Sequence, residues 1–251
     1  MSILFLLDCS FKETMIPRII HYCWFGRGPL PELAQQCIES WHKHMPDYEY
    51  MLWNEENFEV NGSPYTREAY GSHKYAFVSD VARLVALAKH GGIYLDVDFF
   101  VYKPFDDLLH YTAFAGFEGS KHQPLMMGVI ASEPGGEWIT EQLRNYEGRH
   151  FLVDGKMDLT TNVRFISERM QENGFRPNGL EQEYKDLHIF PVEFFCPRLT
   201  TGEYRKTEIT YCEHLGETSS WAKRSFKDGI LHLFNPEFRT KVILLKRRLL
   251  G

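Results

Sequence analysis

Residues 91–98, Gly-Gly-Ile-Tyr-Leu-Asp-Val-Asp, constrain the fold of this chain more than any other stretch. The two glycines end a helical pattern, and the alternating apolar residues after them predict a strand that continues to residue 102. On such a strand, Asp96 and Asp98 lie on the same face as Tyr94. Two like charges on an otherwise apolar strand are costly unless a cation or hydrogen-bond donors offset them.

Two interpretations of Asp96 and Asp98 follow. An Asp-X-Asp on its own is most often a strand end whose carboxylates are solvated. The alternative is a divalent-cation site, because hard carboxylate oxygens suit Mg²⁺ or Mn²⁺ and a metal-bound diphosphate. The Gly-Gly-Ile-Tyr-Leu context and the helical pattern before it favour the cation site.

The helical pattern covers residues 73–90. Asp80 and Arg83 are three residues apart on it, close enough to contact each other. They form either an exposed ion pair of little energetic value or a partly buried pair that marks a functional site. The second interpretation is favoured by their Ala, Val and Leu neighbours. The core-facing positions are Phe77, Val81, Leu84, Val85 and Ala88.

The remaining pattern alternates strands and helices, which indicates an α/β fold. An apolar strand at residues 16–26 ends in a glycine turn, where open α/β sheets present ligands, and Tyr48 to Trp53 predicts a second strand. Residues 54–72 are expected to be a loop because Asn61-Gly62 and Ser63-Pro64 are turn signals. Later strands are expected at 114–117, 125–130, 188–191 and 211–214, and helices after Pro29 and at 137–146 and 162–173.

We expect one domain over residues 15–239, preceded by an extension at 1–14 and followed by a tail at 240–251. Against 28 Lys and Arg stand 34 Asp and Glu, and this net charge of −6 argues against a nucleic-acid partner. The five cysteines form an odd set without Cys-X-X-Cys, which indicates reduced thiols and a cytoplasmic location. No apolar run approaches the roughly 20 residues that span a bilayer, and the start of the chain lacks a signal-peptide pattern.

Four motifs occur in a fixed order: residues 16–26, Trp53-Asn54, residues 75–84 and residues 91–98. Together they resemble the bacterial sugar transferases with an Asp-X-Asp motif, family 32 of the glycosyltransferases. That family is related to yeast initiating α-mannosyltransferases and distantly to the clostridial glucosylating toxins. The resemblance covers residues 16–109, with a fainter match to about residue 222.

The resemblance implies a GT-A fold, with a single twisted, mostly parallel sheet flanked by helices around a nucleotide-sugar site. Trp24 would stack on the nucleotide base, although a tryptophan here would otherwise be a core residue. Asp80 and Arg83 would hold the transferred sugar and the diphosphate, and Tyr94 would lie beside the donor. Asn54 and Asn162 are further candidates for donor or acceptor contacts.

The resemblance also implies a Mn²⁺ or Mg²⁺ cofactor. Asp98 would be a direct metal ligand, and Asp96 would reach ribose, sugar or metal. His214 and Trp221 occupy the place of a late loop that closes over the diphosphate. They suggest a further metal ligand and a donor-binding lid, or else ordinary packing. Relatives usually carry paired histidines closer to the tryptophan, and many place a small polar residue where this chain has Met126-Met127.

The implied activity is that of a metal-dependent, retaining glycosyltransferase, with Asp80, Arg83, Asp96 and Asp98 as the catalytic set. The donor is expected to be a UDP-sugar rather than a GDP-sugar. The acceptor would be a glycan or lipid-linked saccharide in the assembly of capsule, lipopolysaccharide or exopolysaccharide. A front-face route without a protein nucleophile is favoured over attack by Asp80. The alternatives are a toxin-like transferase that glycosylates a protein and a sugar-nucleotide-binding protein without turnover.

Residues 241–250 combine four basic with six large apolar side chains. On a helix, the basic groups could reach anionic headgroups while the apolar ones enter the interface, which suggests a peripheral membrane contact. The alternative is a terminal helix packed on the domain.

Overall fold

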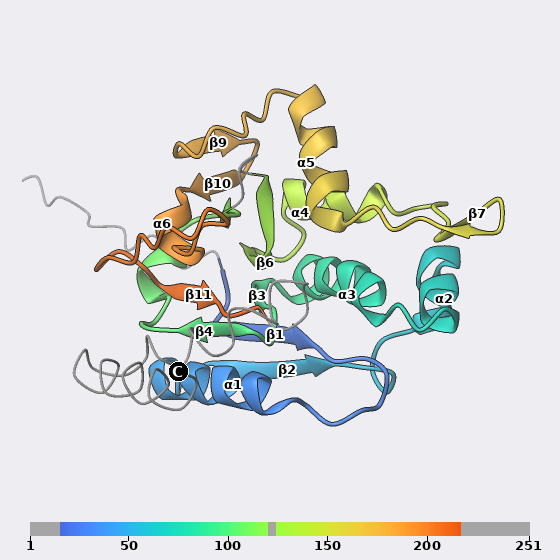
Figure 1. Ribbon diagram of the computed structural model, residues 1–251, viewed down its shortest axis with the longest axis horizontal. Helices are drawn as coiled ribbons and strands as arrows, with labels where there is room; N and C mark the ends of the chain where they lie inside the picture. Colours follow the sequence, from blue (N-terminus) through green and yellow to red (C-terminus); the bar gives the residue numbers. More distant parts are fainter. Residues whose placement is uncertain (1–15, 120–123, 217–251) are drawn as a thin grey trace, which may run out of the picture.

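The computed structural model describes residues 16–119 and 124–216. Its centre is a seven-stranded sheet in the order β2-β1-β3-β6-β5-β10-β9 (Figure 1). Five of these strands run in one direction, and β6 and β9 run in the other. The expected α/β fold with a mostly parallel sheet is therefore confirmed. The strands are β1 (Ile19–Cys23), β2 (Glu49–Trp53), β3 (Gly92–Leu95), β5 (Ala113–Phe117), β6 (Leu125–Ser132), β9 (Gln182–Tyr184) and β10 (Leu187–Phe190).

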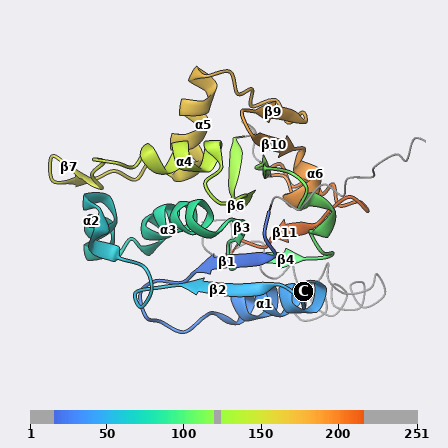
Figure 2. The same ribbon diagram turned by 180° about the vertical axis from the view of Figure 1, so that it is seen from behind.

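Helices cover both faces of this sheet, and each face has its own apolar core. One core contains side chains from α2, α3, α4 and α5, with Trp138 among them. The other contains side chains from α1 and α6, with Trp41 among them. Figures 1 and 2 show α1 and α3 on either side of β1. The helices are α1 (Glu32–His44), α2 (Pro64–Gly71), α3 (Tyr75–His90), α4 (Glu137–Arg144), α5 (Asn162–Glu172) and α6 (Val192–Phe195).

The strand predicted to run through the Asp-X-Asp motif is instead two strands. β3 ends at Leu95, and β4 (Phe99–Val101) pairs with β11 (Cys212–His214) in a separate two-stranded sheet. Asp96 to Asp98 form a turn between them, in which the Phe99 amide donates to the Asp96 carbonyl at 3.0 Å. Asp96 and Asp98 therefore do not share a strand face, because the chain leaves the central sheet between them.

The loop predicted over residues 54–72 was also wrong in part, because α2 occupies Pro64–Gly71. Ser63 caps this helix, since its hydroxyl accepts a hydrogen bond from the Thr66 amide at 3.1 Å. Pro64 occupies the first turn, where its missing N–H leaves no bond unmade. A Ser-Pro pair occurs at helix starts as well as in turns. Here α2 packs against α3, and this tertiary contact favours the helix.

The other predicted elements are present with shifts of a few residues at their ends. No helix among the described residues is both long and apolar enough to cross a bilayer. The predictions for the extension at 1–14, for Trp221 and for the tail at 240–251 lie outside the residues that the structure describes.

Gly91 and Gly92 join α3 to β3 through a very tight connection. Both have positive φ, 65° and 105°, a conformation that favours glycine. A Cβ atom on Gly92 would lie 2.6 Å from the Ile19 carbonyl oxygen, and one on Gly91 would lie 2.6 Å from Pro134. This close approach fixes α3 against β1 and β3, and so fixes residues on α3 relative to those that follow β3.

His21 makes this connection sensitive to acid. It is fully buried on β1, where Trp53 Nε1 donates to its Nδ1 at 3.1 Å. Its Nε2 must therefore carry the proton that is donated to the Gly91 carbonyl at 2.8 Å. Burial lowers the pKa of His21 from 6.5 to about 4, although the Gly91 hydrogen bond opposes the shift.

We expect His21 to make the free energy of unfolding fall as the pH drops from about 6.5 towards 4. In that range the unfolded chain protonates His21 while the folded protein excludes the proton, at a cost of up to ~3 kcal/mol. Urea unfolding across this range should show a shallower decline for His21→Gln than for the wild type. Equal declines would mean that other groups cause the acid sensitivity.

Candidate active site

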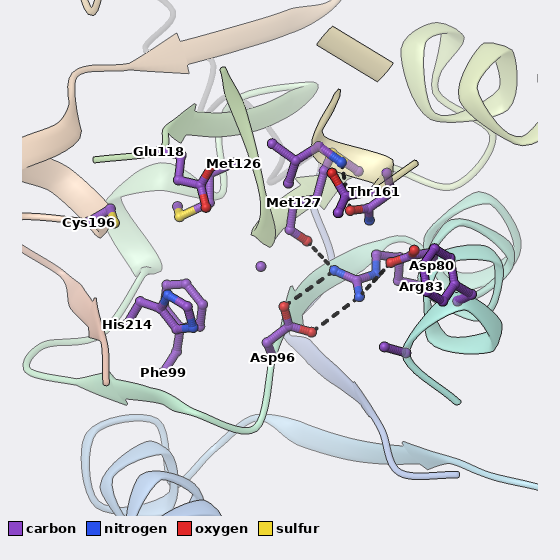
Figure 3. Close-up of a pocket in the computed structure, with 15 residues that line it drawn as sticks. Asp80, Arg83, Asp96, Phe99, Glu118, Met126, Met127, Thr161, Cys196 and His214 are labelled. Carbon is purple, nitrogen blue, oxygen red and sulfur yellow. Dashed lines mark hydrogen bonds and ion pairs between the residues drawn. The ribbon is translucent and has the colours of Figure 1, made fainter. Parts of the chain in front are cut away.

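A cavity of about 240 Å³ opens where the carboxyl ends of β3 and β5 meet the start of β6. Figure 3 shows two walls facing each other across it. One wall carries Asp80, Arg83, Asp96 and Thr161, and the other carries Phe99, Glu118, Met126, Cys196 and His214.

Arg83 is the centre of the first wall. Its guanidinium lies 3.1 Å from Asp80 and 3.3 Å from Asp96, and it donates to the Met127 carbonyl at 2.6 Å. Asp80 and Arg83 are only 7% and 5% exposed, so this is a buried ion pair and not a surface one. Its Nε also donates to the Ser79 carbonyl at 3.2 Å, and a buried charge with four partners of fixed geometry is a rigid anchor for the cavity.

Asp96 is held from behind by Tyr94. The Tyr94 hydroxyl donates to Asp96 at 2.7 Å, and the Arg83 guanidinium lies 4.5 Å from the centre of the Tyr94 ring. Tyr94 is only 1% exposed and is not one of the residues that line the cavity. It therefore positions the carboxylate and the guanidinium from beneath the cavity floor.

A bulge in β6 shapes the cavity floor. Ala115 of β5 pairs with Ile130 of β6, and Phe117 pairs with Leu125. Between these two pairs β5 moves on by two residues and β6 by five, so β6 contains the extra residues. The irregular stretch turns the Met127 carbonyl to Arg83 and the Gly128 carbonyl to the Asp96 amide, at 2.8 Å. A Cβ atom on Gly128 would lie 2.5 Å from the Phe99 ring, so only glycine fits here. Bulges often redirect groups beside active sites in this way.

Asp98 and His214 form a second pair. Residue His214 aligns with Phe99 in the β4–β11 sheet, stacks on its ring at 4.8 Å, and places Nε2 3.0 Å from Asp98 Oδ2. Burial lowers the pKa of His214, but the Asp98 carboxylate outweighs this effect and raises the pKa to about 9. His214 therefore keeps its second ring proton at neutral pH.

The Arg83 cluster shares one positive charge between two carboxylates. Burial raises the pKa of Asp80 to about 7, with Arg83 opposing and Asp96 adding to the shift. Burial alone would lower the pKa of Arg83, but Asp96, Tyr94 and Asp80 raise it. Arg83 is therefore a permanent cation, and Asp80 can gain or lose a proton near neutral pH.

The donor set beside the cavity suits a divalent cation that also binds a ligand. Within the described ranges, no three His, Cys, Asp or Glu side chains are grouped closely enough to hold a metal ion alone. Asp96, Asp98 and His214 nevertheless offer carboxylate oxygen and imidazole nitrogen, and Mg²⁺ commonly takes one or two carboxylates and completes its shell with substrate phosphates.

Trp24 and Asn54 do not line the cavity. Trp24 follows β1, is half-buried, and donates through Nε1 to the Gly28 carbonyl at 2.7 Å. Asn54 follows β2, and its side chain accepts from the Glu56 amide at 2.8 Å to close a turn. Because β1, β2 and β3 are parallel neighbours, both residues lie at the same edge of the sheet as Asp96.

Sequence reasoning missed Glu118 and Thr161. The one sequence feature that could have indicated Glu118 is a charged residue directly after the apolar strand β5. Thr161 caps α5 and lies beside Asn162, which does line the cavity. The Asn162 side-chain NH₂ group is buried without a hydrogen-bond partner in the described structure, and it therefore offers a donor to a ligand.

Residues 31–115 match the family model of a glycosyltransferase sugar-binding region containing the DXD motif. This region contains Asp80, Arg83, Asp96 and Asp98 but neither Glu118 nor His214.

Curated relatives include inositol phosphoceramide mannosyltransferase 3 of Schizosaccharomyces pombe, 38% identical over half of this chain and 39% of that protein. Glucan organizing enzyme 1 of Cryptococcus neoformans is 28% identical over 63% of this chain and 54% of its own length. The chain thus spans about half or less of these relatives. The solved structure of the PaToxG glycosyltransferase superposes with a TM-score of 0.46 at 18% identity, over 63% of this chain and 70% of that one.

Proposed function

We propose that this chain transfers a sugar from a nucleotide-sugar donor, because residues 31–115 match the model of a glycosyltransferase sugar-binding region containing a DXD motif. The observation that carries the proposal is the buried Arg83, which joins Asp80 to Asp96 beside the Asp98–His214 pair. The cavity at the end of β3 thus has a permanent cation, the Arg83 guanidinium, and beside it several side chains that can bind a metal cation. That arrangement suits a sugar diphosphate, in the GT-A-type fold that the sequence resemblance implies.

The departing diphosphate explains the charges at the site. Breaking the bond between sugar and phosphate builds negative charge on the diphosphate, which Arg83 would stabilise at no cost in reorganisation because it is already held by four partners. Asp96, Asp98 and His214 would hold Mn²⁺ or Mg²⁺, which supplies Lewis-acid stabilisation of the same charge when bound. The proton on His214 must leave for the imidazole to become a ligand, so cation affinity should rise with pH.

The sugar would be held by the first wall. Asp80 near neutral pH can accept from or donate to sugar hydroxyls, and the Asn162 NH₂ group adds a donor. We propose transfer with retention by a front-face route, in which a departing phosphate oxygen takes the acceptor proton. Asp80 is less suited to act as a nucleophile because Arg83 holds its carboxylate.

The finer assignments are also proposals. We favour a UDP-sugar over a GDP-sugar, a glycan or lipid-linked saccharide acceptor, and a cytoplasmic role in surface-polysaccharide assembly. The names of several relatives specify mannose transfer, so GDP-mannose belongs in any test.

The test is a panel of UDP- and GDP-sugars with Mn²⁺ or Mg²⁺, in which release of the nucleoside diphosphate is measured. We expect release from one donor class and none without the cation. Binding of donors without release, across the whole panel, would instead support the alternative of a sugar-nucleotide-binding protein without turnover.

Trp24→Ala should weaken donor binding more than it slows the chemical step. If the indole stacks on the base, its loss removes uniform binding and raises the donor KM by about tenfold or more at a similar kcat. Because Trp24 is only half-buried, the melting temperature should barely change. An unchanged KM together with a lower melting temperature would make Trp24 a packing residue.

A further inference from the structure

The wall opposite Arg83 contains a carboxylate that the proposed chemistry does not use. Glu118 follows β5, and its amide donates to the Pro124 carbonyl at 2.9 Å. The next residue, Gly119, accepts from the Thr200 amide at 2.6 Å, and a Cβ atom there would lie 2.6 Å from the Arg198 carbonyl. The backbone on both sides of the carboxylate is therefore fixed against the rest of the protein.

Glu118 differs in its bonding from the other carboxylates in and beside the cavity. Asp80 and Asp96 are paired with Arg83, and Asp98 is paired with His214. The Glu118 side chain has no hydrogen bond or ion pair with any other described residue, although it lines the cavity. Burial raises the pKa of Glu118, and the nearby His214 charge only partly opposes this. An unpaired carboxylate held in such a place lowers stability unless a ligand supplies the missing donors.

The surroundings restrict what that ligand can be. Glu118 repels an anion, so the diphosphate belongs near Arg83, which lies across the cavity from Glu118 (Figure 3). A neutral group with O–H donors satisfies the carboxylate without bringing a charge. Met126 and Phe99 also line this wall, and both are apolar, so they bring no charge to the ligand.

We propose that Glu118 is an acceptor-binding residue, which accepts a hydrogen bond from a hydroxyl of an uncharged sugar on the acceptor. This inference rests on the proposed glycosyl transfer and adds the class of acceptor group that the site takes. The acceptor sugar then lies against Glu118, and the donor phosphate next to Arg83 lies across the cavity from it, with the transferred sugar between them.

The test compares donor hydrolysis with transfer in Glu118→Gln, a variant that keeps the volume of the side chain. Nucleoside diphosphate release without acceptor should fall much less than transfer does. Transfer to methyl α-glycosides of mannose, glucose and galactose should fall at least 30-fold in kcat/KM for the acceptor. Saturation-transfer NMR, with nucleoside diphosphate and Mg²⁺ present, should show glycoside binding to the wild type and little binding to the variant.

Stability supplies a second readout, with Glu213 as the matched control. Glu213 is a buried glutamate that accepts hydrogen bonds from Tyr102, Tyr204 and Arg198. Glu213→Gln should lower the melting temperature, whereas Glu118→Gln should leave it unchanged or raise it, because it removes an unpaired charge.

Three outcomes would overturn the assignment of Glu118. Equal losses of hydrolysis and transfer would place it with the donor. Unaltered transfer would leave it without a role at the site, and glycosides that fail to bind the wild type would exclude the acceptor class. A wild type that releases no nucleoside diphosphate from any donor would instead refute the glycosyl transfer itself.

Discussion

Asp98→Asn should lower turnover by about 100-fold or more and leave the fold intact. The substitution removes the charge that would hold the cation but keeps an oxygen that can accept from His214. Losing a main electrostatic stabiliser of a departing anion costs two to three orders of magnitude in rate. The measurement is kcat at saturating donor over a range of Mn²⁺ concentrations, with circular dichroism as the check on folding.

Asp186→Asn is a suitable control. Asp186 accepts from the Glu137 and Trp138 amides at the start of α4 and does not line the cavity. Its loss should reduce stability, as for a helix cap, with kcat retained. Near-normal turnover of Asp98→Asn at high Mn²⁺ would contradict the assignment of Asp98 as a metal ligand.

Arg83→Lys should be nearly as damaging, with kcat lower by roughly 100-fold, although the charge is conserved. A lysine ammonium is a point charge and cannot bridge Asp80, Asp96 and the Met127 carbonyl at once as the planar guanidinium does. Breaking a buried ion pair typically costs about 3–5 kcal/mol, so a lower melting temperature is expected as well. Kinetics must therefore be measured well below that temperature.

Arg149→Lys separates the loss of activity from the loss of stability. Arg149 is a partly buried arginine, paired with Asp158 at 2.7 Å and lying 3.8 Å from the centre of the Phe165 ring, but it does not line the cavity. We expect this variant to be less stable and to keep most of its turnover. If Arg83→Lys and Arg149→Lys lose kcat equally, Arg83 has only a structural role.

Local sequence patterns predicted those parts of the site that lie on one element. The spacing of Asp80 and Arg83 on a helix with an apolar face was enough to predict a buried pair, because helical periodicity is a local property. The glycines before β3 predicted where α3 ends for the same reason.

The parts that were wrong or missed depend on contacts between distant segments. Alternation over residues 93–102 fits one long strand, but the Gly128 carbonyl binds the Asp96 amide and β11 pairs with β4, so the chain turns between them. No local pattern contains this information. Glu118 was missed because its importance lies in the absence of a side-chain partner among the described residues, which only the assembled walls of the cavity reveal.

The β4–β11 pairing brings Asp98 and His214 together, and it can form only late in synthesis of the chain. Asp98 and His214 are separated by 116 positions, and a ribosome delivers the amino end first. A nascent chain that has reached α5 already carries Asp80, Arg83, Asp96 and Glu118, yet its Asp98 has no imidazole beside it. Closing so long a loop is also a slow, late event in folding. Prematurely terminated chains that lack β11 would therefore lack this pair.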